Sequence, residues 1–297
     1  MSRHRPAMLA EVLQLLDVQK GDTVVDGTVG HGGHAEAMAE MAGKEGELIA
    51  FDWDGEMLRT AMANLENTEI GKMFVNADYR SVPDWVSSHR PNGVDRVLLD
   101  FGVNLQHFED VTRGFSFQGD APLDMRMDRD TKETAAAWLN RASEGEIARA
   151  LREFGGELWS GPIAKRITAR RKEGRLKTTS DLVDAVYSAI PPAKRDKKIH
   201  PATRTFQAVR IAINRELENL EETVADIAGC LAPGGRIVTL SYHSGEDAAV
   251  KNAFRNLAKE GNFTVITKKP LRPSEQETKE NPNARSARLR ALERSEQ

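Results

Sequence analysis

Four short apolar runs with helical stretches between them constrain the fold of this chain more than any other feature. The runs cover residues 23–25, 48–51, 73–75 and 94–99. Short strands that alternate with helices are typical of βαβ units, in which neighbouring strands run parallel. An amphipathic helix is expected before the first run, because Leu9, Val12, Leu13 and Leu16 share one helical face.

The strand and helix alternation stops after Asp100, where about a hundred mainly helical residues follow. The sheet pattern then resumes, with a helix over 205–230, a strand over 236–242 and two further strands over 263–267 and 287–292. A Pro233-Gly234-Gly235 turn is expected before the strand over 236–242. The polar, Pro-containing segment 268–283 is predicted to be a loop.

This arrangement predicts an α/β fold built from two domains. Residues 1–107 and 203–297 are expected to form a discontinuous cofactor-binding domain, and residues 108–202 an inserted helical domain. Ligands of open α/β sheets bind at the carboxyl edge of the strands. Because the insertion follows the fourth strand at that edge, we expect it to form the other wall of an active site.

The composition excludes several classes of protein. No stretch approaches the roughly 18 consecutive apolar residues of a membrane-spanning helix, so neither membrane insertion nor secretion is expected. Cys230 is the only cysteine, which excludes a disulfide framework and a cysteine-based zinc site and suits the cytoplasm. No metal site is predicted.

The net charge is −3, yet residues 162–210 contain 13 Lys or Arg against 4 Asp or Glu. That segment either binds a polyanion or forms a solvated helical surface.

Residues 23–35 predict a strand, a glycine-rich turn and the start of a helix. Gly27, Gly30, Gly32 and Gly33 lie within seven residues of one another. Glycines let a ligand approach the backbone closely, and the N–H groups at the start of a helix face it. The segment also fits the dinucleotide pattern GxGxxA. It therefore predicts an adenosine-containing cofactor without deciding between hydride and methyl transfer, the alternative being a tight turn without a ligand.

Acidic side chains follow the next three strands. Asp52 comes about twenty residues after the glycines, where it would accept both ribose hydroxyls or cap the next helix. Asp78 and Tyr79 follow the third strand and either bracket the adenine or form a surface turn. Asp100 closes the apolar fourth strand and is expected to point toward the reactive end of the cofactor.

Several motifs occur together in an order that is typical of one family. They are Asp26-Gly27-Thr28, Gly32-Gly33-His34, LDFGV over 99–103, RGFSF over 113–117, LDMRM over 123–127, HPATRTFQAVRI over 200–211 and SYHS over 241–244. Together they resemble the RsmH (MraW) family, bacterial methyltransferases that act on cytosine N4 in small-subunit ribosomal RNA. The resemblance implies a class I, Rossmann-like methyltransferase with a mostly parallel sheet and an inserted α-helical substrate-recognition domain.

The resemblance also implies which residues contact S-adenosylmethionine. They are Gly32, Gly33, His34, Asp52, Tyr79, Asp100 and His107. Tyr79 stands where the family usually has Phe, and His107 occupies the position of a cofactor-contacting Gln. Other departures are Asn104 and Leu105 in place of two serines, Tyr242 in place of Phe, and Gly245 and Ala248 in place of Leu and Arg. These changes surround the reactive centre, so they bear on substrate identity or rate more than on the fold.

A reaction at cytosine N4 requires mainly orientation, because the lone pair of that nitrogen is delocalised into the ring. Asp100 and Asn104 are expected to accept the amino hydrogens. His243 either accepts the proton after transfer or is a structural loop histidine.

The target base has to leave its stack to reach a buried methyl donor. The residues expected to line its pocket are Arg113, Phe115, Asp124, Arg126 and Arg210. As an alternative, Asp124 and Arg126 form a buried ion pair and Phe115 packs in the core. Arg210 shares a helical face with Gln207 and Asn214, which meets either the substrate or the inserted domain.

Three functions follow from these readings. The first is a methyltransferase whose partner is small-subunit ribosomal RNA. The second is a nicotinamide-dependent oxidoreductase, for which the sequence supplies no hydride-transfer site. The third is a catalytically weakened paralogue that binds ribosomal RNA as an assembly factor, suggested by the departures over 104–107 and at Gly245. The number of associated chains, a homodimer included, stays open.

Overall fold

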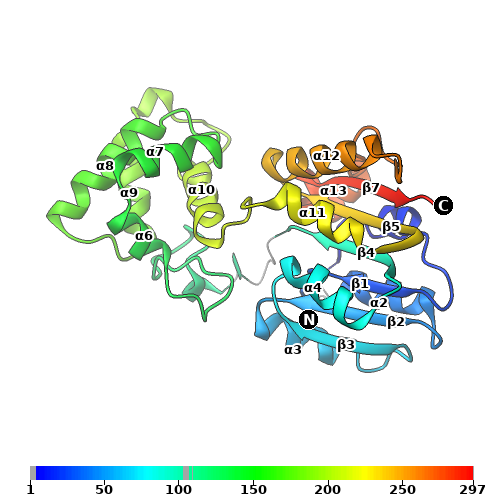
Figure 1. Cartoon of the computed structure of the whole chain (residues 1–297). Coiled ribbons are helices and arrows are strands. Elements are labelled where there is room, and N and C mark those ends of the chain that lie inside the picture. Colours follow the sequence, from blue (N-terminus) through cyan, green and yellow to red (C-terminus); the bar gives the residue numbers. More distant parts are fainter. Residues whose placement is uncertain (1–4, 103–106, 109, 297) are drawn as a thin grey trace. The chain divides into compact units, whose positions relative to one another are not determined.

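The computed structural model describes residues 5–102, 107–108 and 110–296 and divides into two compact units (Figure 1). The first unit consists of Met1–Gly102 and Asn219–Gln297, and the second of Val103–Glu218. Residues 203–218, expected in the cofactor-binding domain, belong to the second unit, because Phe206, Ala208 and Val209 are buried in its hydrophobic core.

The first unit is built on a seven-stranded sheet with the order β3-β2-β1-β4-β5-β7-β6. The strands are β1 Thr23–Asp26, β2 Glu47–Asp52, β3 Gly71–Asn76, β4 Val94–Asp100, β5 Leu231–Ser241, β6 Phe263–Val265 and β7 Arg288–Arg294. The first five strands pair in parallel, and β7 is antiparallel to both β5 and β6. The predicted parallel sheet is confirmed, and its central strands are apolar because both of their faces are covered.

Helices cover both faces of the sheet (Figure 1). They are α1 Leu9–Leu16, α2 Gly33–Ala42, α3 Gly55–Asn64, α4 Val82–His89, α11 Leu220–Gly229 and α12 Ser244–Lys259. Residues of α1, α2 and α3 share a core with Val24, Leu48 and Leu98 of the strands. The side chain of Phe51 points to the opposite face, where its ring lies 5.8 Å from that of Trp85 in α4.

The structure corrects three sequence predictions. The helix expected over 205–230 is two helices, α10 Thr203–Asn214 and α11, because Arg215 and Asn219 adopt positive φ angles of 52° and 53° between them. The Pro-Gly-Gly turn lies inside β5, at an irregularity in its pairing with β4. The segment predicted to be a loop contains α13 Glu275–Glu280 and the 3₁₀ helix η4 Pro282–Ser286.

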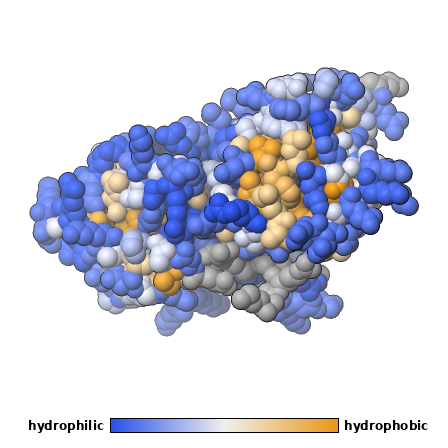
Figure 2. Space-filling view, turned by 90° about the horizontal axis from the view of Figure 1, so that it is seen from below, coloured by the Kyte–Doolittle hydropathy of each residue, from blue (hydrophilic) through white to orange (hydrophobic). Residues whose placement is uncertain are grey.

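The second unit is helical, as expected for the insertion. Its elements are η2 Val111–Arg113, α6 Ala135–Arg141, α7 Glu144–Glu153, α8 Ser160–Glu173, α9 Thr179–Ala189, η3 Pro192–Lys194 and α10. Capping boxes begin α7 at Ser143 and α9 at Thr178 and satisfy backbone N–H groups at the helix starts. Figure 2 shows mostly hydrophilic side chains on the face of this unit that it displays. Among the described helices of the whole chain, none is long and apolar enough to cross a membrane.

The second unit has its own hydrophobic core, which a matched pair of substitutions tests. Leu151 in α7 is fully buried in that core, whereas Leu158 is 86% exposed. Leu151→Ala should lower the free energy of unfolding by about 2–5 kcal/mol, because it removes buried methyl groups and leaves a cavity. Leu158→Ala should change it by less than about 0.5 kcal/mol. Urea denaturation measures the free energy of unfolding of both variants. Equal effects of the two substitutions would contradict the burial of Leu151 in a core of the second unit.

Candidate cofactor site and substrate-recognition elements

The glycine-rich turn joins the end of β1 to the start of α2. Gly32 has a φ of 82° and precedes α2 without a capping side chain, so the first N–H groups of this helix are left for other acceptors. A Cβ atom on Gly27 would stand 2.5 Å from Cδ2 of Leu99, so a larger residue would have to displace this side chain for the turn to pass this close to β4. The turn therefore has the form predicted for a ligand-binding loop at the carboxyl edge of the sheet.

Asp52 ties this turn to the end of β2. Its Oδ2 accepts a hydrogen bond from the Gly30 N–H at 2.9 Å, and its Oδ1 accepts one from the Asp54 N–H at 2.9 Å. Burial raises the pKa of Asp52 to about 6, against the opposing effect of these two hydrogen bonds. The carboxylate thus lies beside the glycine loop, where the sequence predicted a ribose acceptor.

Asp100 ends β4, is half-buried, and meets the polar side chains of Tyr242 and His34. Its Oδ2 lies 3.4 Å from the hydroxyl of Tyr242, which donates to it, and 3.9 Å from Nδ1 of His34. The Asp100 N–H donates to Oγ1 of Thr28 at 2.7 Å, and the Gly102 N–H donates to Asp100 Oδ1 at 2.9 Å. Burial raises the pKa of Asp100, and the neighbouring His34 opposes that rise. Two expected cofactor contacts, His34 and Asp100, therefore lie together.

Asp26 is the third carboxyl group at this edge, and it is the most deeply buried of the three, with 1% of its surface exposed. Its Oδ1 accepts a hydrogen bond from the Thr28 N–H at 3.0 Å. Burial raises the pKa of Asp26 to about 7, and the charges of Asp100 and Asp52 add to the rise. The sequence shows Asp26 only as part of a motif and indicates no role for it in the site. Its burial depends on β2 and β4, which pair with β1 on either side.

Residues 5–8 pack against the glycine loop. The Ala7 carbonyl lies 3.0 Å from Nε2 of His34, and a Cβ on Gly33 would stand 3.2 Å from the Pro6 ring. The segment is held from its other side, because the Met8 N–H donates to Oε1 of Glu277 in α13 at 3.2 Å. Burial lowers the pKa of His34, against the opposing effect of the neighbouring Asp100. Residues 268–283, which the sequence predicted to be a loop, therefore contain a helix that holds the segment beside the candidate site.

Tyr79 begins the 3₁₀ helix η1, Tyr79–Ser81, directly after β3. Its ring contacts that of Phe101 at 5.6 Å in an edge-to-face arrangement, and its Cβ borders the position of Gly27. Asp78 accepts a hydrogen bond from the Arg80 N–H at 2.9 Å and so caps η1. Tyr79 therefore lies beside the glycine loop. Asp78 caps the turn, which is the second of the two roles that the sequence left open for it.

His243 caps helix α12. Its Nδ1 accepts hydrogen bonds from the N–H groups of Gly245 at 3.2 Å and Glu246 at 3.4 Å. Its Nε2 lies 2.9 Å from Oε1 of Glu246, whose other oxygen accepts from the Tyr242 N–H at 2.7 Å. The described contacts give His243 a structural role, since the lone pair of Nδ1 is engaged.

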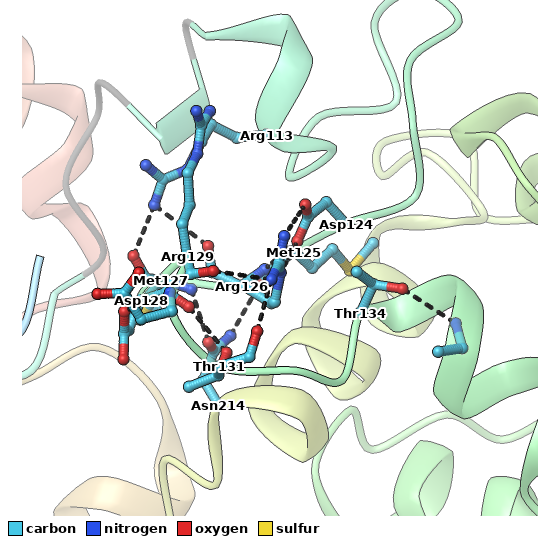
Figure 3. Close-up of polar contacts among 12 residues, drawn as sticks. Arg113, Asp124, Met125, Arg126, Met127, Asp128, Arg129, Thr131, Thr134 and Asn214 are labelled. Atoms are coloured by element: carbon cyan, nitrogen blue, oxygen red, sulfur yellow. Dashed lines mark hydrogen bonds and ion pairs between the residues drawn. The ribbon is translucent and has the colours of Figure 1, made fainter.

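In the second unit, an irregular loop over 124–131 is held by side chains from both ends of the unit's sequence (Figure 3). The Arg113 Nη2 donates to the Met127 carbonyl at 2.7 Å and to the Arg126 carbonyl at 3.1 Å. From α10, the Asn214 amide accepts from the Met127 N–H and donates to the Met125 carbonyl, both at 2.8 Å. Met125 has a φ of 61°, a left-handed conformation that is uncommon for a side chain of this size. These contacts fix the loop without regular secondary structure.

Asp124 and Arg126 form the ion pair that was one of their two alternatives. Arg126 donates to both carboxylate oxygens, through Nε at 2.7 Å and Nη2 at 2.8 Å. The pair lowers the pKa of Asp124 although burial opposes this. Arg210 likewise donates to both oxygens of Glu216, at 2.9 and 2.8 Å. The arginines expected at a base pocket therefore make hydrogen bonds within the second unit.

Phe115 is buried in the second unit, with 4% of its surface exposed. The ring of His107 stacks on it at 5.2 Å. This places His107, which was expected to contact the cofactor, beside an expected substrate residue. Asn104 lies outside the described residues.

The seven-stranded sheet, with five parallel strands and an antiparallel β7 between β5 and β6, is the Rossmann-like arrangement of class I methyltransferases. The family model of the MraW methylase family matches residues 1–295, and the chain belongs to this family. It is similar to three proteins named ribosomal RNA small subunit methyltransferase H. That of Syntrophus aciditrophicus is 41% identical over 99% of this chain and 98% of its own length. Those of Syntrophobacter fumaroxidans and Heliobacterium mobile are 39% and 41% identical, over 98% of this chain and 96% and 98% of their own lengths.

Family membership decides between the cofactors that the glycine spacing left open. The protein depends on S-adenosylmethionine, and the nicotinamide alternative is wrong.

The buried carboxyl groups make stability depend on pH in an unusual direction. The folded protein holds Asp26 with a pKa of about 7, against an ordinary value of 3.8, so it binds more protons than the unfolded chain between these values. The free energy of unfolding should therefore fall as pH rises through this range. Asp26→Asn keeps an acceptor for the Thr28 N–H and should stabilise the ligand-free protein near pH 8, by at most about 4 kcal/mol.

Urea denaturation at about pH 4 and about pH 8 measures this effect, and the gain should disappear at the lower pH. The exposed Asp226 provides a control, because Asp226→Asn removes one carboxyl group without changing a buried one. A wild-type protein that is as stable as Asp26→Asn near pH 8 would contradict the burial of a charged group at this position.

Proposed function

We propose that this protein transfers a methyl group from S-adenosylmethionine to N4 of a cytidine in small-subunit ribosomal RNA. The observation that carries the proposal is Asp100, a half-buried acceptor at the end of β4 that Thr28 fixes beside the glycine loop. Membership in the MraW methylase family and nearly full-length relatives named for small-subunit ribosomal RNA support the choice of substrate. Such a substrate implies a cytoplasmic enzyme.

The chemistry of the site fits a cationic cofactor. In the ligand-free protein, burial raises the pKa values of Asp26, Asp52 and Asp100, which means that their negative charges lack compensation. S-adenosylmethionine carries a sulfonium and an ammonium group, and positive charge nearby favours ionised carboxylates. The residues that we propose to hold it are Gly32, Gly33, His34, Asp52, Tyr79 and Asp100, with His107 as a further contact.

The proposed work of the protein is to orient the amino group and to remove its proton. S-adenosylmethionine supplies an electrophilic methyl group. Asp100 would accept a hydrogen bond from N4, which localises the nitrogen lone pair, and Asn104 would accept the other amino hydrogen. Because burial raises the pKa of Asp100, its carboxylate is also suited to take the proton that N4 loses. His243 is less suited, since its Nδ1 accepts two backbone hydrogen bonds.

In the second unit, we propose that the exposed residues of the loop over 124–131 meet the target base, whereas the buried ring of Phe115 acts within the unit. Arg113, Asp124, Arg126 and Arg210 would act by holding these elements in place, because their polar atoms already bind groups of the same unit. This proposal separates residues that touch the base from residues that position them.

A methyl-transfer assay tests the proposed reaction. The wild-type protein should transfer label from S-adenosylmethionine to cytosine in small ribosomal subunits that lack their own cytosine N4 methylation. Asp100→Ala should lower kcat by a factor on the order of 100 to 1,000, because it removes the proposed acceptor. Asp226→Ala, at an exposed position of α11, should leave kcat unchanged. Unaltered turnover of Asp100→Ala would remove Asp100 from the mechanism. No label in cytosine with intact cofactor binding would indicate an assembly factor that only binds ribosomal RNA.

Two glycines at opposite ends of α2 test the cofactor loop. Gly32 and Gly43 have φ angles of 82° and 69°, so alanine is strained at either position by about 1–3 kcal/mol. Gly32→Ala should also raise the Kd for S-adenosylmethionine by about tenfold, a loss of about 1.4 kcal/mol, because the strain falls on the loop that we propose to bind it. Gly43→Ala should leave this Kd unchanged. Calorimetric titration gives both constants, and equal Kd values for the two variants would argue against this loop.

A further inference from the structure

Between residues 162 and 210, the arginines and the lysines of the basic excess differ in how available their charges are to a partner. Four of its seven arginines, Arg170, Arg171, Arg195 and Arg210, make hydrogen bonds within the second unit, and of the others only Arg175 is exposed. Arg170 pairs with Asp181 and Asp184, both at 3.3 Å, and Arg171 donates to the carbonyls of Leu139 and Ala142. Its lysines are exposed; they are Lys165, Lys172, Lys177, Lys194, Lys197 and Lys198. The charge that is available to a partner therefore comes mainly from lysines, and half of them lie within five residues.

Arg195 anchors this densest group of lysines to the end of helix α9. Its Nη2 donates to the Tyr187 carbonyl at 2.7 Å, and its Nε donates to the Ile190 carbonyl at 3.1 Å. Its guanidinium group also lies over the Tyr187 ring, 4.7 Å from the centroid. Both carbonyls belong to the C-terminal end of the helix, where a positive charge is favourable. The segment 191–199 is thus fixed at its centre by a half-buried arginine.

A stack of rings supports the same segment where it enters α10. The Tyr187 hydroxyl lies 3.3 Å from Nε2 of His200, and the His200 ring stacks on Phe117 at 4.2 Å with an interplanar angle of 13°. Phe117 in turn packs edge-to-face on Phe206 at 5.4 Å. The His200 Nδ1 accepts from the Ala202 N–H at 3.2 Å. The segment therefore rests on the core of the second unit, although most of its residues are exposed.

The side chains on this fixed segment carry one sign of charge. Lys194, Lys197 and Lys198 are exposed, and none of them makes an ion pair with another residue that the structure describes. Asp196 is the one acidic residue of the segment, and its Oδ1 accepts a hydrogen bond from the Lys198 N–H at 2.8 Å. The backbone that carries these three ammonium groups is already held in place. Binding of an anionic partner therefore costs little backbone conformational entropy.

We propose that residues 194–198, which we call the lysine loop, bind the phosphate backbone of the RNA substrate. The inference rests on the proposed function, which makes RNA the partner. Lysine is a flexible point charge, and it contacts phosphates without reading the bases. The lysine loop would thus add affinity that does not depend on base sequence, while the choice of the target base would lie elsewhere.

The test compares two triple variants of the full-length protein. K194Q/K197Q/K198Q removes the charge of the lysine loop, and K165Q/K172Q/K177Q removes three equally exposed charges from the rest of the basic segment. Fluorescence anisotropy with a labelled single-stranded RNA, titrated at several salt concentrations, gives Kd and its salt dependence. The first variant should raise Kd about tenfold or more at low salt and reduce the slope of log K against log salt by about 2, because each phosphate contact on a single strand contributes about 0.7.

The control variant should shift both quantities much less. Equal losses in the two variants would show that any surface lysine contributes, and RNA binding of the first variant like that of the wild type would also overturn the inference. The wild-type methyl-transfer assay separates this result from the proposed function. A wild-type protein that methylates RNA while the first variant binds RNA normally refutes only the lysine loop. A wild-type protein that binds RNA through the lysine loop and transfers no methyl group refutes only the proposed reaction.

Discussion

The candidate site of the first unit is shaped by three carboxyl groups at one edge of a parallel sheet, of which Asp26 is buried and Asp52 and Asp100 are half-buried. Asp26, Asp52 and Asp100 end neighbouring strands, and removing each of them from water disfavours its charged form. The backbone offsets part of this cost, because N–H groups of the glycine loop and of residues after the strands donate to these oxygens. The remaining negative charge at this edge favours a ligand with cationic groups, and the sulfonium and ammonium groups of S-adenosylmethionine fit this requirement. The carboxyl groups therefore lower the stability of the ligand-free fold at the residues that we propose to bind the cofactor.

The second unit solves a different problem, which is to hold an irregular loop in one conformation. Its solution is to satisfy the carbonyl groups of the loop with side chains, namely Arg113, Arg126 and Asn214 (Figure 3). Each of these residues binds the backbone, so the loop keeps its shape independently of the exposed side chains that it presents. The exposed residues of such a loop are then available for recognition. At the lysine loop, an arginine that binds backbone carbonyls is likewise combined with exposed charged side chains.

The sequence predicts those parts of this structure that local patterns encode. The strands up to β4 are recognisable because buried parallel strands are short apolar runs, and Asp52 and Asp100 because they follow such runs. Helix α13 has six polar residues and no apolar face, so no periodicity marks it. Asn214 holds residues that are 87 and 89 positions away in the chain, and no local signal reports a contact at that distance. The pKa values of the carboxyl groups are equally non-local, since they depend on how the strands bury one another.

The order of the strands has a consequence for the synthesis of the chain on the ribosome. Strand β4 pairs with β5, yet residues 103–218 are made between them. One edge of β4 therefore stays without its partner until the whole second unit has emerged, and an unpaired strand edge is prone to association with other chains. The second unit is continuous in sequence, so it has the local contacts to fold during this interval. Once it is folded, the effective length of the connection between β4 and β5 shrinks, and so does the entropic cost of closing the sheet.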